Sequence, residues 1–175
     1  LAQRALARFE VDHFLIEVER DLADAYLELR LLPEAIALYD TLALRLQEQG
    51  NEATLPWLLM QRARALAQAG QHAEAEATLL LAQMKFACQD NTAGVVLAEL
   101  AGLELMLAPN ADPSTADACT YRTALIAKSL PQNLAQRAQL LQAVACRMSQ
   151  QPGRALALLQ PLCAADLTTA SPQRQ

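Results

Sequence analysis

Residues 22–46, LADAYLELRLLPEAIALYDTLALRL, decide the fold that the sequence predicts. Apolar side chains recur every three or four residues up to Leu29, and they do so again from Ala35 to Leu46, which is the period of an amphipathic helix. Pro33 interrupts the pattern once, and proline fits the first turn of a helix because its missing N–H would be unpaired there. The stretch therefore predicts two helices joined by a tight turn.

Small and large residues share the faces that these two helices would bring together. Ala23 and Ala35 are small enough for two helices to approach closely, and Tyr26 and Tyr39 are large enough to fill the space around them. The combination predicts a helix-turn-helix hairpin.

The composition extends this expectation to the whole chain. Hydrophobic residues make up 53% of the 175 residues, and there are only five glycines. Alanine and leucine dominate, and they are the best helix formers among the apolar residues. We expect an all-α protein, long enough for one globular domain or one short solenoid.

The charge excludes some partners and leaves others open. The net charge is −5, and the lysines and arginines are scattered along the chain, whereas a nucleic-acid binder would carry a basic stripe. No apolar run reaches the roughly 18 residues of a membrane span. We expect no nucleic-acid or membrane partner and a cytoplasmic location. The chain begins at Leu1 and shows no signal peptide, so we also expect it to be a piece of a longer protein.

Four cysteines, at positions 88, 119, 146 and 163, lie among apolar helical residues. No pair has the close spacing of a zinc site or a redox motif. We interpret them as buried free thiols in a reducing compartment, with a disulfide or a metal site as the alternative.

The breaks in the pattern predict four helical hairpins, at residues 13–51, 52–91, 92–129 and 130–167. Residues 1–10 would be the tail of a preceding helix, with Asp12 as a cap before the next, although one long helix is also possible. Gly50 and Gly70 mark helix ends. The candidate helix caps are Thr92 for one helix and either Asp112 or Ser114 for the next. Pro161 should kink or shorten the last helix, and residues 168–175 should be disordered.

Ala35, Ala75 and Ala155 each provide the small residue in the first turn of a second helix, at steps of 40 and 80 residues. The missing member of the series falls at Thr115, also inside a predicted second helix. A fixed period is typical of a solenoid. A globular bundle of eight helices is the alternative, and it would have no reason to keep a period.

Three segments resemble the tetratricopeptide (TPR) repeat: LADAYLELRLLPEAIALY, RARALAQAGQHAEAEATLLLA and CRMSQQPGRALALLQPL. Ala23, Tyr26, Ala35 and Tyr39 occupy the signature positions of the first. The unit from Thr92 to Lys128 departs from the pattern, and a 40-residue period exceeds the roughly 34 residues of a typical TPR unit. The resemblance implies a right-handed α-solenoid of about four units that acts as a protein-binding scaffold without cofactors or enzymatic activity.

Residues 38–91, LYDTLALRLQEQGNEATLPWLLMQRARALAQAGQHAEAEATLLLAQMKFACQDN, are also similar to TPR segments that precede CHAT (caspase-like) protease domains in bacterial proteins. This likeness implies the sensing or docking segment of a larger regulatory protein, with further repeats or an effector domain elsewhere in the parent. A sensor array of a signal-responsive transcription activator, binding a small ligand, is the alternative. An enzyme is a remote third reading.

In TPR proteins the first helix of each unit lines a concave face that holds the partner. The resemblance assigns ten residues of this chain to that face: Glu17, Arg20, Asp24, Glu28, Trp57, Met60, Arg64, Arg137, Leu140 and Arg147. Trp57 and Met60 suit an apolar anchor, and a packing role for Trp57 between the first two units is equally open.

One acidic stripe on the first helix consists of Glu17, Asp21, Asp24 and Glu28. Arg20 lies beside this stripe and could pair with Glu17 or Asp24. Like charges at this spacing repel by a few tenths of a kcal/mol per pair. A solvated face with local ion pairs explains the stripe simply, and a binding site for a basic segment is the sharper hypothesis. No catalytic triad, phosphate loop or metal-spaced cluster is visible, and the same carboxylates are the only candidates for acid–base chemistry.

Overall fold

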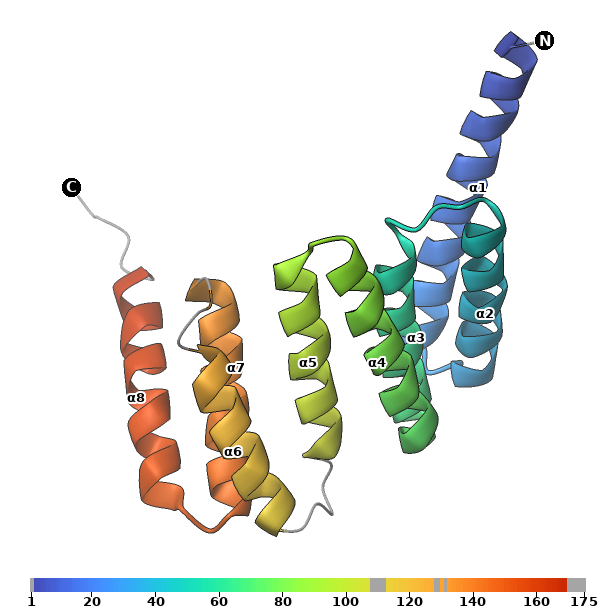
Figure 1. The fold of residues 1–175 in the computed structure, drawn as a ribbon. Helices are drawn as coiled ribbons and strands as arrows, with labels where there is room; N and C mark the ends of the chain where they lie inside the picture. The colour runs from blue at the N-terminus through green and yellow to red at the C-terminus, as the bar shows by residue number, and fades with distance from the viewer. Residues whose placement is uncertain (1, 108–112, 128–129, 131, 170–175) are drawn as a thin grey trace. The chain divides into compact units, whose positions relative to one another are not determined.

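The computed structural model describes residues 2–107, 113–127, 130 and 132–169. These residues form eight helices and contain no strand (Figure 1), which confirms the all-α class. In chain order the helices are α1 (Ala2–Glu28), α2 (Leu32–Glu48), α3 (Leu55–Gln68), α4 (His72–Cys88), α5 (Thr92–Met106), α6 (Pro113–Ala127), α7 (Gln132–Met148) and α8 (Pro152–Thr169).

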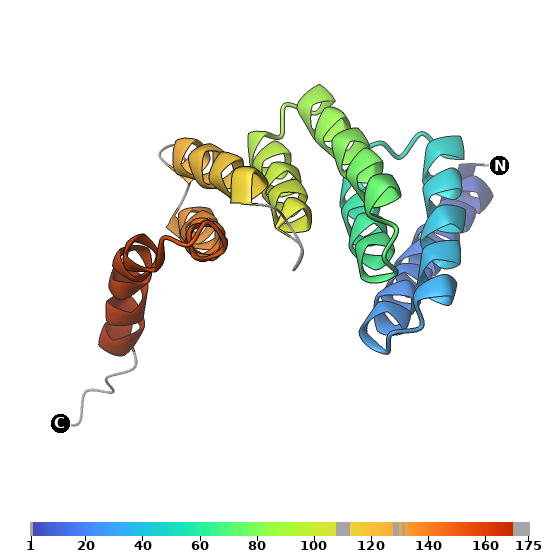
Figure 2. The same cartoon turned by 90° about the horizontal axis from the view of Figure 1, so that it is seen from below.

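The chain divides into two compact units, Leu1–Glu99 and Leu100–Gln175, and the boundary falls inside α5. In the first unit α1 packs on α2, and α3 contacts both α2 and α4 (Figure 2). In the second unit α7 contacts both α6 and α8. Helices that follow one another in the chain are thus packed together within each unit, as in helical hairpins.

A common turn ends several helices. The left-handed backbone conformation occurs at Arg30, Gly50, Gly70, Asp90 and Gln150. In each case the next N–H donates to the carbonyl five residues earlier, as from Leu31 to Tyr26 (N···O 2.9 Å), which is the Schellman type of helix end. In the first unit these residues stand at positions 30, 50, 70 and 90, so α1 to α4 end at equal intervals. The helix ends predicted at Gly50 and Gly70 are confirmed.

Two predicted helix starts are wrong. Residues 2–28 form one continuous helix, so the alternative of a single long helix is confirmed and Asp12 does not cap a new one. The cap of α5 is Asn91, whose Oδ1 accepts a hydrogen bond from the N–H of Gly94 at 2.9 Å. Thr92 is already the first residue of α5. Both asparagine and threonine cap helices, so composition alone could not separate them. Asp112 lies outside the described residues, and Ser114, the other candidate for that cap, lies inside α6.

The end of the chain is more helical than predicted. Pro161 lies inside α8, which continues to Thr169, so the prediction that this proline shortens the helix is wrong. Proline removes one backbone hydrogen bond from a helix, and α8 tolerates that loss. The helix includes residues 168 and 169, the first two of the predicted tail. Residues 170–175 lie outside the described residues.

The core of the first unit uses the small and large residues expected from the sequence. Ala23, Ala35 and Tyr39 are completely buried, and Tyr26 is partly buried against the same cluster. Burying a side chain as large as leucine or phenylalanine contributes about 1.5–3 kcal/mol. The packing of α1 on α2 is therefore organised around these positions.

The cysteines do not share one environment. Cys119 and Cys146 are buried, as predicted, but Cys88 and Cys163 are exposed, and all four are free thiols. Burial raises the pKa of the Cys119 thiol, and the charge of Arg122 opposes part of that rise. Within the described ranges, no helix combines the length and the apolar character needed to cross a membrane.

Candidate functional site

Seven of the ten predicted site residues lie in the first unit, on α1 and α3. Two of them meet directly, because Arg64 Nη2 of α3 lies 3.2 Å from Glu28 Oε1 of α1. The Glu28 and Arg64 side chains are 69% and 53% exposed, and an exposed ion pair contributes at most about 1 kcal/mol. Both charged groups are therefore in contact with solvent and can exchange partners at little cost.

The acidic stripe of α1 is largely compensated within the protein. Arg20 pairs with Glu17 at 2.6 Å and approaches Asp21 at 3.4 Å. Asp24 accepts a hydrogen bond from the Tyr39 hydroxyl of α2 at 2.5 Å. Of its two predicted partners, Arg20 thus pairs with Glu17. Tyr39 of α2 and Arg64 of α3 reduce the repulsion between the carboxylates of the stripe, and the sequence of α1 alone could not predict these two partners.

Tyr39 connects the stripe to the core. Burial, followed by the hydrogen bond and the charge of Asp24, raises the pKa of the Tyr39 hydroxyl above its ordinary value. The hydroxyl therefore stays protonated and remains a donor to Asp24 throughout the physiological range. Asp24 is partly exposed to solvent, and its hydrogen bond to Tyr39 also links α1 to α2.

Trp57 is both packed and exposed. Its ring meets the ring of Phe86 edge to face, with centroids 4.8 Å apart and planes at 74°, a favourable geometry for aromatic pairs. Phe86 is completely buried on α4, whereas 45% of Trp57 is exposed. This ring partner belongs to the hairpin of Trp57 itself, and packing of Trp57 between the first two hairpins stays a prediction. Met60 is partly buried against the core of the same unit.

The other three predicted residues lie on α7 in the second unit. The guanidinium of Arg137 binds both carboxylate oxygens of Glu104 at 2.9 Å, the bidentate arrangement that arginine favours. These hydrogen bonds raise the pKa of Arg137, and partial burial opposes the rise. Leu140 and Arg147 are exposed, with half of Leu140 open to solvent. They form an apolar and basic stripe on α7.

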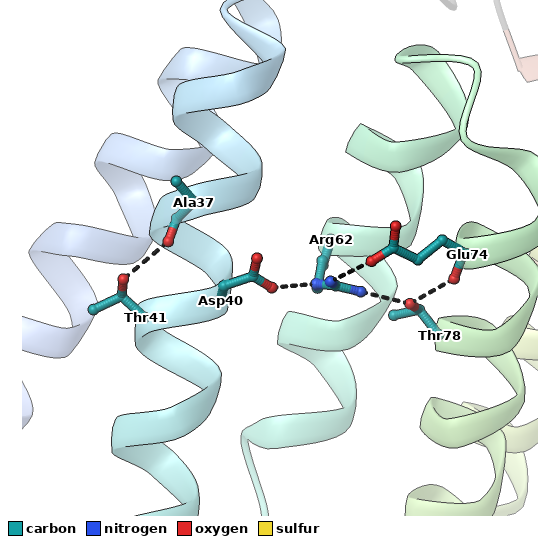
Figure 3. A network of polar contacts seen from close by, with 6 residues as sticks. All are labelled: Ala37, Asp40, Thr41, Arg62, Glu74 and Thr78. Carbon is teal, nitrogen blue, oxygen red and sulfur yellow. Dashed lines mark hydrogen bonds and ion pairs between the residues drawn. The ribbon is translucent and has the colours of Figure 1, made fainter.

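Arg62 of α3 was not among the predicted site residues, although its side chain makes three polar contacts in the first unit. Arg62 of α3 reaches Asp40 of α2 with Nε (2.5 Å), and it reaches Thr78 and Glu74 of α4 with its two terminal nitrogens (2.7 and 2.9 Å). Thr78 in turn donates to the backbone carbonyl of Glu74 at 2.7 Å. Figure 3 shows Arg62 lying between the two neighbouring helices. One side chain therefore links α2, α3 and α4.

Arg62 is 17% exposed. Burial by itself would lower the pKa of its guanidinium, but the hydrogen bonds and charges of Asp40 and Glu74 outweigh that effect and raise it. A signal in the sequence could have found the residue. Arg62 stands four residues after Leu58 and four before Leu66, so it falls on the buried stripe of α3, where a charge requires a partner.

Potential metal ligands are present among the described residues as histidine, cysteine and acidic side chains. Within them, no group of three or more histidine, cysteine or acidic side chains could hold a metal ion. His72 is exposed at the start of α4, and the side chain of His13 lies outside the described residues. The carboxylates of α1, the only acid–base candidates, hold the internal partners described above.

No family model, curated protein or solved structure matches the chain. The resemblance to TPR repeats rests on the sequence segments that carry it.

Proposed function

We propose that the chain is a right-handed TPR-like α-solenoid of about four units with a 40-residue period, and that it binds a protein or peptide segment. The helix ends support the period, since the left-handed residues after α1 and α3 stand at positions 30 and 70, and those after α2 and α4 at positions 50 and 90. A fixed interval between helix ends is typical of an array of similar stacked units.

The exposed indole of Trp57 is the observation that carries the proposed binding face. Phe86 holds the ring in place from one side while almost half of its surface faces solvent. A rigid aromatic surface contributes much contact area with little loss of side-chain entropy on binding. Arg64 follows on the same helix, seven residues after Trp57, and brings Glu28 of α1 to the same face. The segment therefore binds with an apolar side chain on Trp57.

The Glu28–Arg64 pair sets the charge of the ligand. A basic residue of the segment takes the place of Arg64 at Glu28, because the exposed pair contributes little to stability. Ligand and protein then exchange one ion pair for another, and the specificity comes from the charge. On α7, the stripe of Arg137, Leu140 and Arg147 provides a second, basic contact surface.

We infer the context from the resemblance to TPR segments next to CHAT domains. The chain serves as the docking part of a larger bacterial regulatory protein in the cytoplasm, joined to further repeats or an effector domain. Its partner is a protein rather than a nucleic acid or a membrane.

A selection from a displayed library of short random peptides tests the binding face. We expect the selected peptides to combine an apolar and a basic residue and to shift the fluorescence of Trp57, the only tryptophan of the chain. Glu28→Gln should weaken their binding by up to about fivefold, the equivalent of about 1 kcal/mol, with a smaller dependence on salt. Glu76→Gln is the matched control, because Glu76 is exposed on α4.

Two results would contradict the proposal. The library could yield no peptide, or it could yield peptides that leave the Trp57 fluorescence unchanged and bind the Glu28→Gln and Glu76→Gln variants equally well.

A further inference from the structure

The outer face of α1 is apolar and exposed. Leu15, Val18 and Leu22 are 45%, 47% and 44% exposed, and Ala25 continues the stripe. Phe14 and Leu29, at its two ends, are 68% and 69% exposed. The spacing of three, four and three residues places the four central side chains on one side of the helix. Contiguous apolar surface of this kind marks an interaction site.

Helix α3 of the same unit shows how such a face is covered. The same hydrogen-bonded turn follows α1 at Arg30 and α3 at Gly70, so each residue of α1 matches the residue forty positions later in α3. The matching pairs are Leu15 with Leu55, Val18 with Leu58, Leu22 with Arg62 and Ala25 with Ala65. In α3, Leu55 and Ala65 are completely buried and Leu58 is 3% exposed.

Helix α2 covers this face of α3. Leu55 and Leu58 share one core with Tyr39 and Leu42 of α2, and Arg62 pairs with Asp40 of α2. The opposite face of α1, around Ile16 and Ala23, is the one that packs on α2. The exposed stripe of α1 is therefore equivalent to the α3 surface that receives a helix.

We propose that the outer face of α1 binds an amphipathic helix of a partner protein, packed on α1 as α2 packs on α3. This surface shares Glu28 with the face around Trp57 and Arg64, but its apolar stripe lies outside that face, so the inference goes beyond the proposed function. Leu22 stands where α3 has Arg62. The bound helix consequently carries an apolar residue at the position that Asp40 occupies in α2, because a carboxylate against leucine would lose its partner.

The charges beside the stripe define one edge of the bound helix. Asp21 lies three residues after Val18, and Glu28 lies three residues after Ala25, so both border the same side of the stripe. Their side chains are 74% and 69% exposed. A second copy of this acidic chain would bring like charges to the contact. A helix with basic residues along one edge complements them.

The chain itself supplies the probe for a test. A fluorescent peptide of residues 31–49 with Asp40→Leu has the apolar face of α2 without its carboxylate, and a second version also carries Glu34→Lys and Glu48→Lys. Anisotropy titration of the full 175-residue chain measures their affinity. We expect the first peptide to bind and the second to bind several-fold more tightly at low salt, with Asp21→Asn removing most of that gain.

The double substitution Val18→Gln and Leu22→Gln should weaken binding by at least about tenfold, since it removes two apolar contacts. Leu44→Gln is the matched control, because Leu44 is 62% exposed on α2, away from the stripe. All the substituted side chains are exposed, and circular dichroism verifies that the helices persist. The double variant should leave the Trp57 response to the selected library peptides unchanged, so the two proposals fail independently.

Failure of both peptides to bind would overturn the inference, and so would equal affinity for the double variant and the Leu44→Gln control. Self-association of the unsubstituted chain in sedimentation experiments, abolished by the double variant, would assign the face to a second copy and also overturn it.

Discussion

The first unit and the second unit hold a central helix between two neighbours by different means. Arg62 of α3 and Gln142 of α7 both stand eight residues before a left-handed turn residue, Gly70 and Gln150 respectively. Arg62 makes two ion pairs and a further hydrogen bond to α2 and α4. Gln142 is 6% exposed and donates one long hydrogen bond, 3.5 Å, to a backbone carbonyl of α6.

The comparison shows that one helical arrangement can be secured by charge or by close packing. On α7 the residues around Gln142 are small, and Ala143 and Cys146 pack on Ala155 of α8. Small side chains let helices approach and gain dispersion contacts, so a neutral amide is enough at this position. In the first unit the guanidinium spans the distance to both neighbours, and its loss leaves two carboxylates without a donor.

The largest effect should come from breaking the charged link. Arg62→Ala should lower the free energy of unfolding by about 2–3 kcal/mol, because hydrogen bonds to charged groups contribute more than neutral ones. Gln142→Ala, the matched change in the second unit, should cost about 1 kcal/mol. Urea unfolding followed by circular dichroism measures both values. Equal losses would show that the charge of Arg62 adds nothing to the link.

The two glycines of α5, one in each unit, extend the comparison to packing. A Cβ at Gly94 would overlap the ring of Phe86, whereas nothing lies near Gly102. Gly94→Ala should therefore destabilise the protein by about 1–3 kcal/mol through overpacking. Gly102→Ala should stabilise it by up to about 1 kcal/mol through helix propensity. Thermal unfolding of the two variants checks the opposite signs, and a gain for Gly94→Ala would contradict the close contact.

The hydroxyl of Tyr39 adds a pH dependence to the first unit. Because its pKa is raised in the folded state, the unfolded state loses this proton first, from about pH 10 upward. Stability from this group is complete below that pH and falls as the pH rises above it. Tyr39→Phe should cost about 1 kcal/mol at neutral pH, and the difference should shrink above about pH 10. Urea unfolding across this range tests it, and parallel curves for the two proteins would be the contrary result.

The smallest effects should arise at the turns. Gln150→Gly should stabilise the second unit by about 1 kcal/mol, since glycine adopts the left-handed conformation without strain. Asp90→Gly, its counterpart in the first unit, should gain less because aspartate tolerates this conformation better. Gly70→Ala is the control and should lose stability by a similar amount. Melting temperatures of the three variants rank them, and a loss for Gln150→Gly would be inconsistent with the turn.

Local chemistry made the helices predictable. Gly50 and Gly70 marked two helix ends, and Ala23, Ala35 and Tyr39 identified buried positions, because both kinds of signal act within a few residues of sequence. Glycine is absent at Arg30, Asp90 and Gln150, where the fold imposes a left-handed conformation that glycine adopts more readily. Pro161 was a misleading signal, because α8 continues past it to Thr169 despite the backbone hydrogen bond that a proline removes.

The candidate site was predictable only in part. The acidic stripe of α1 follows from helical periodicity, and exposure of Trp57 was one of two open readings based on the resemblance, but neither source predicts their partners. Asp24 meets Tyr39, Glu28 meets Arg64, and Trp57 meets Phe86 across sequence separations that no period could assign. Because of these contacts, most carboxylates of the acidic stripe have a hydrogen-bond or ion-pair partner within the protein.

The sequence by itself therefore determined the helical class, the hairpin around Pro33 and several of the residues that this hairpin buries, because these depend on periodicity and on local backbone preference. The tertiary structure alone decided that Arg62 joins three helices and that the outer face of α1 lacks the cover that α2 gives to α3. Hydrogen bonds and apolar contacts between helices depend on distances in space, and sequence separation does not specify them.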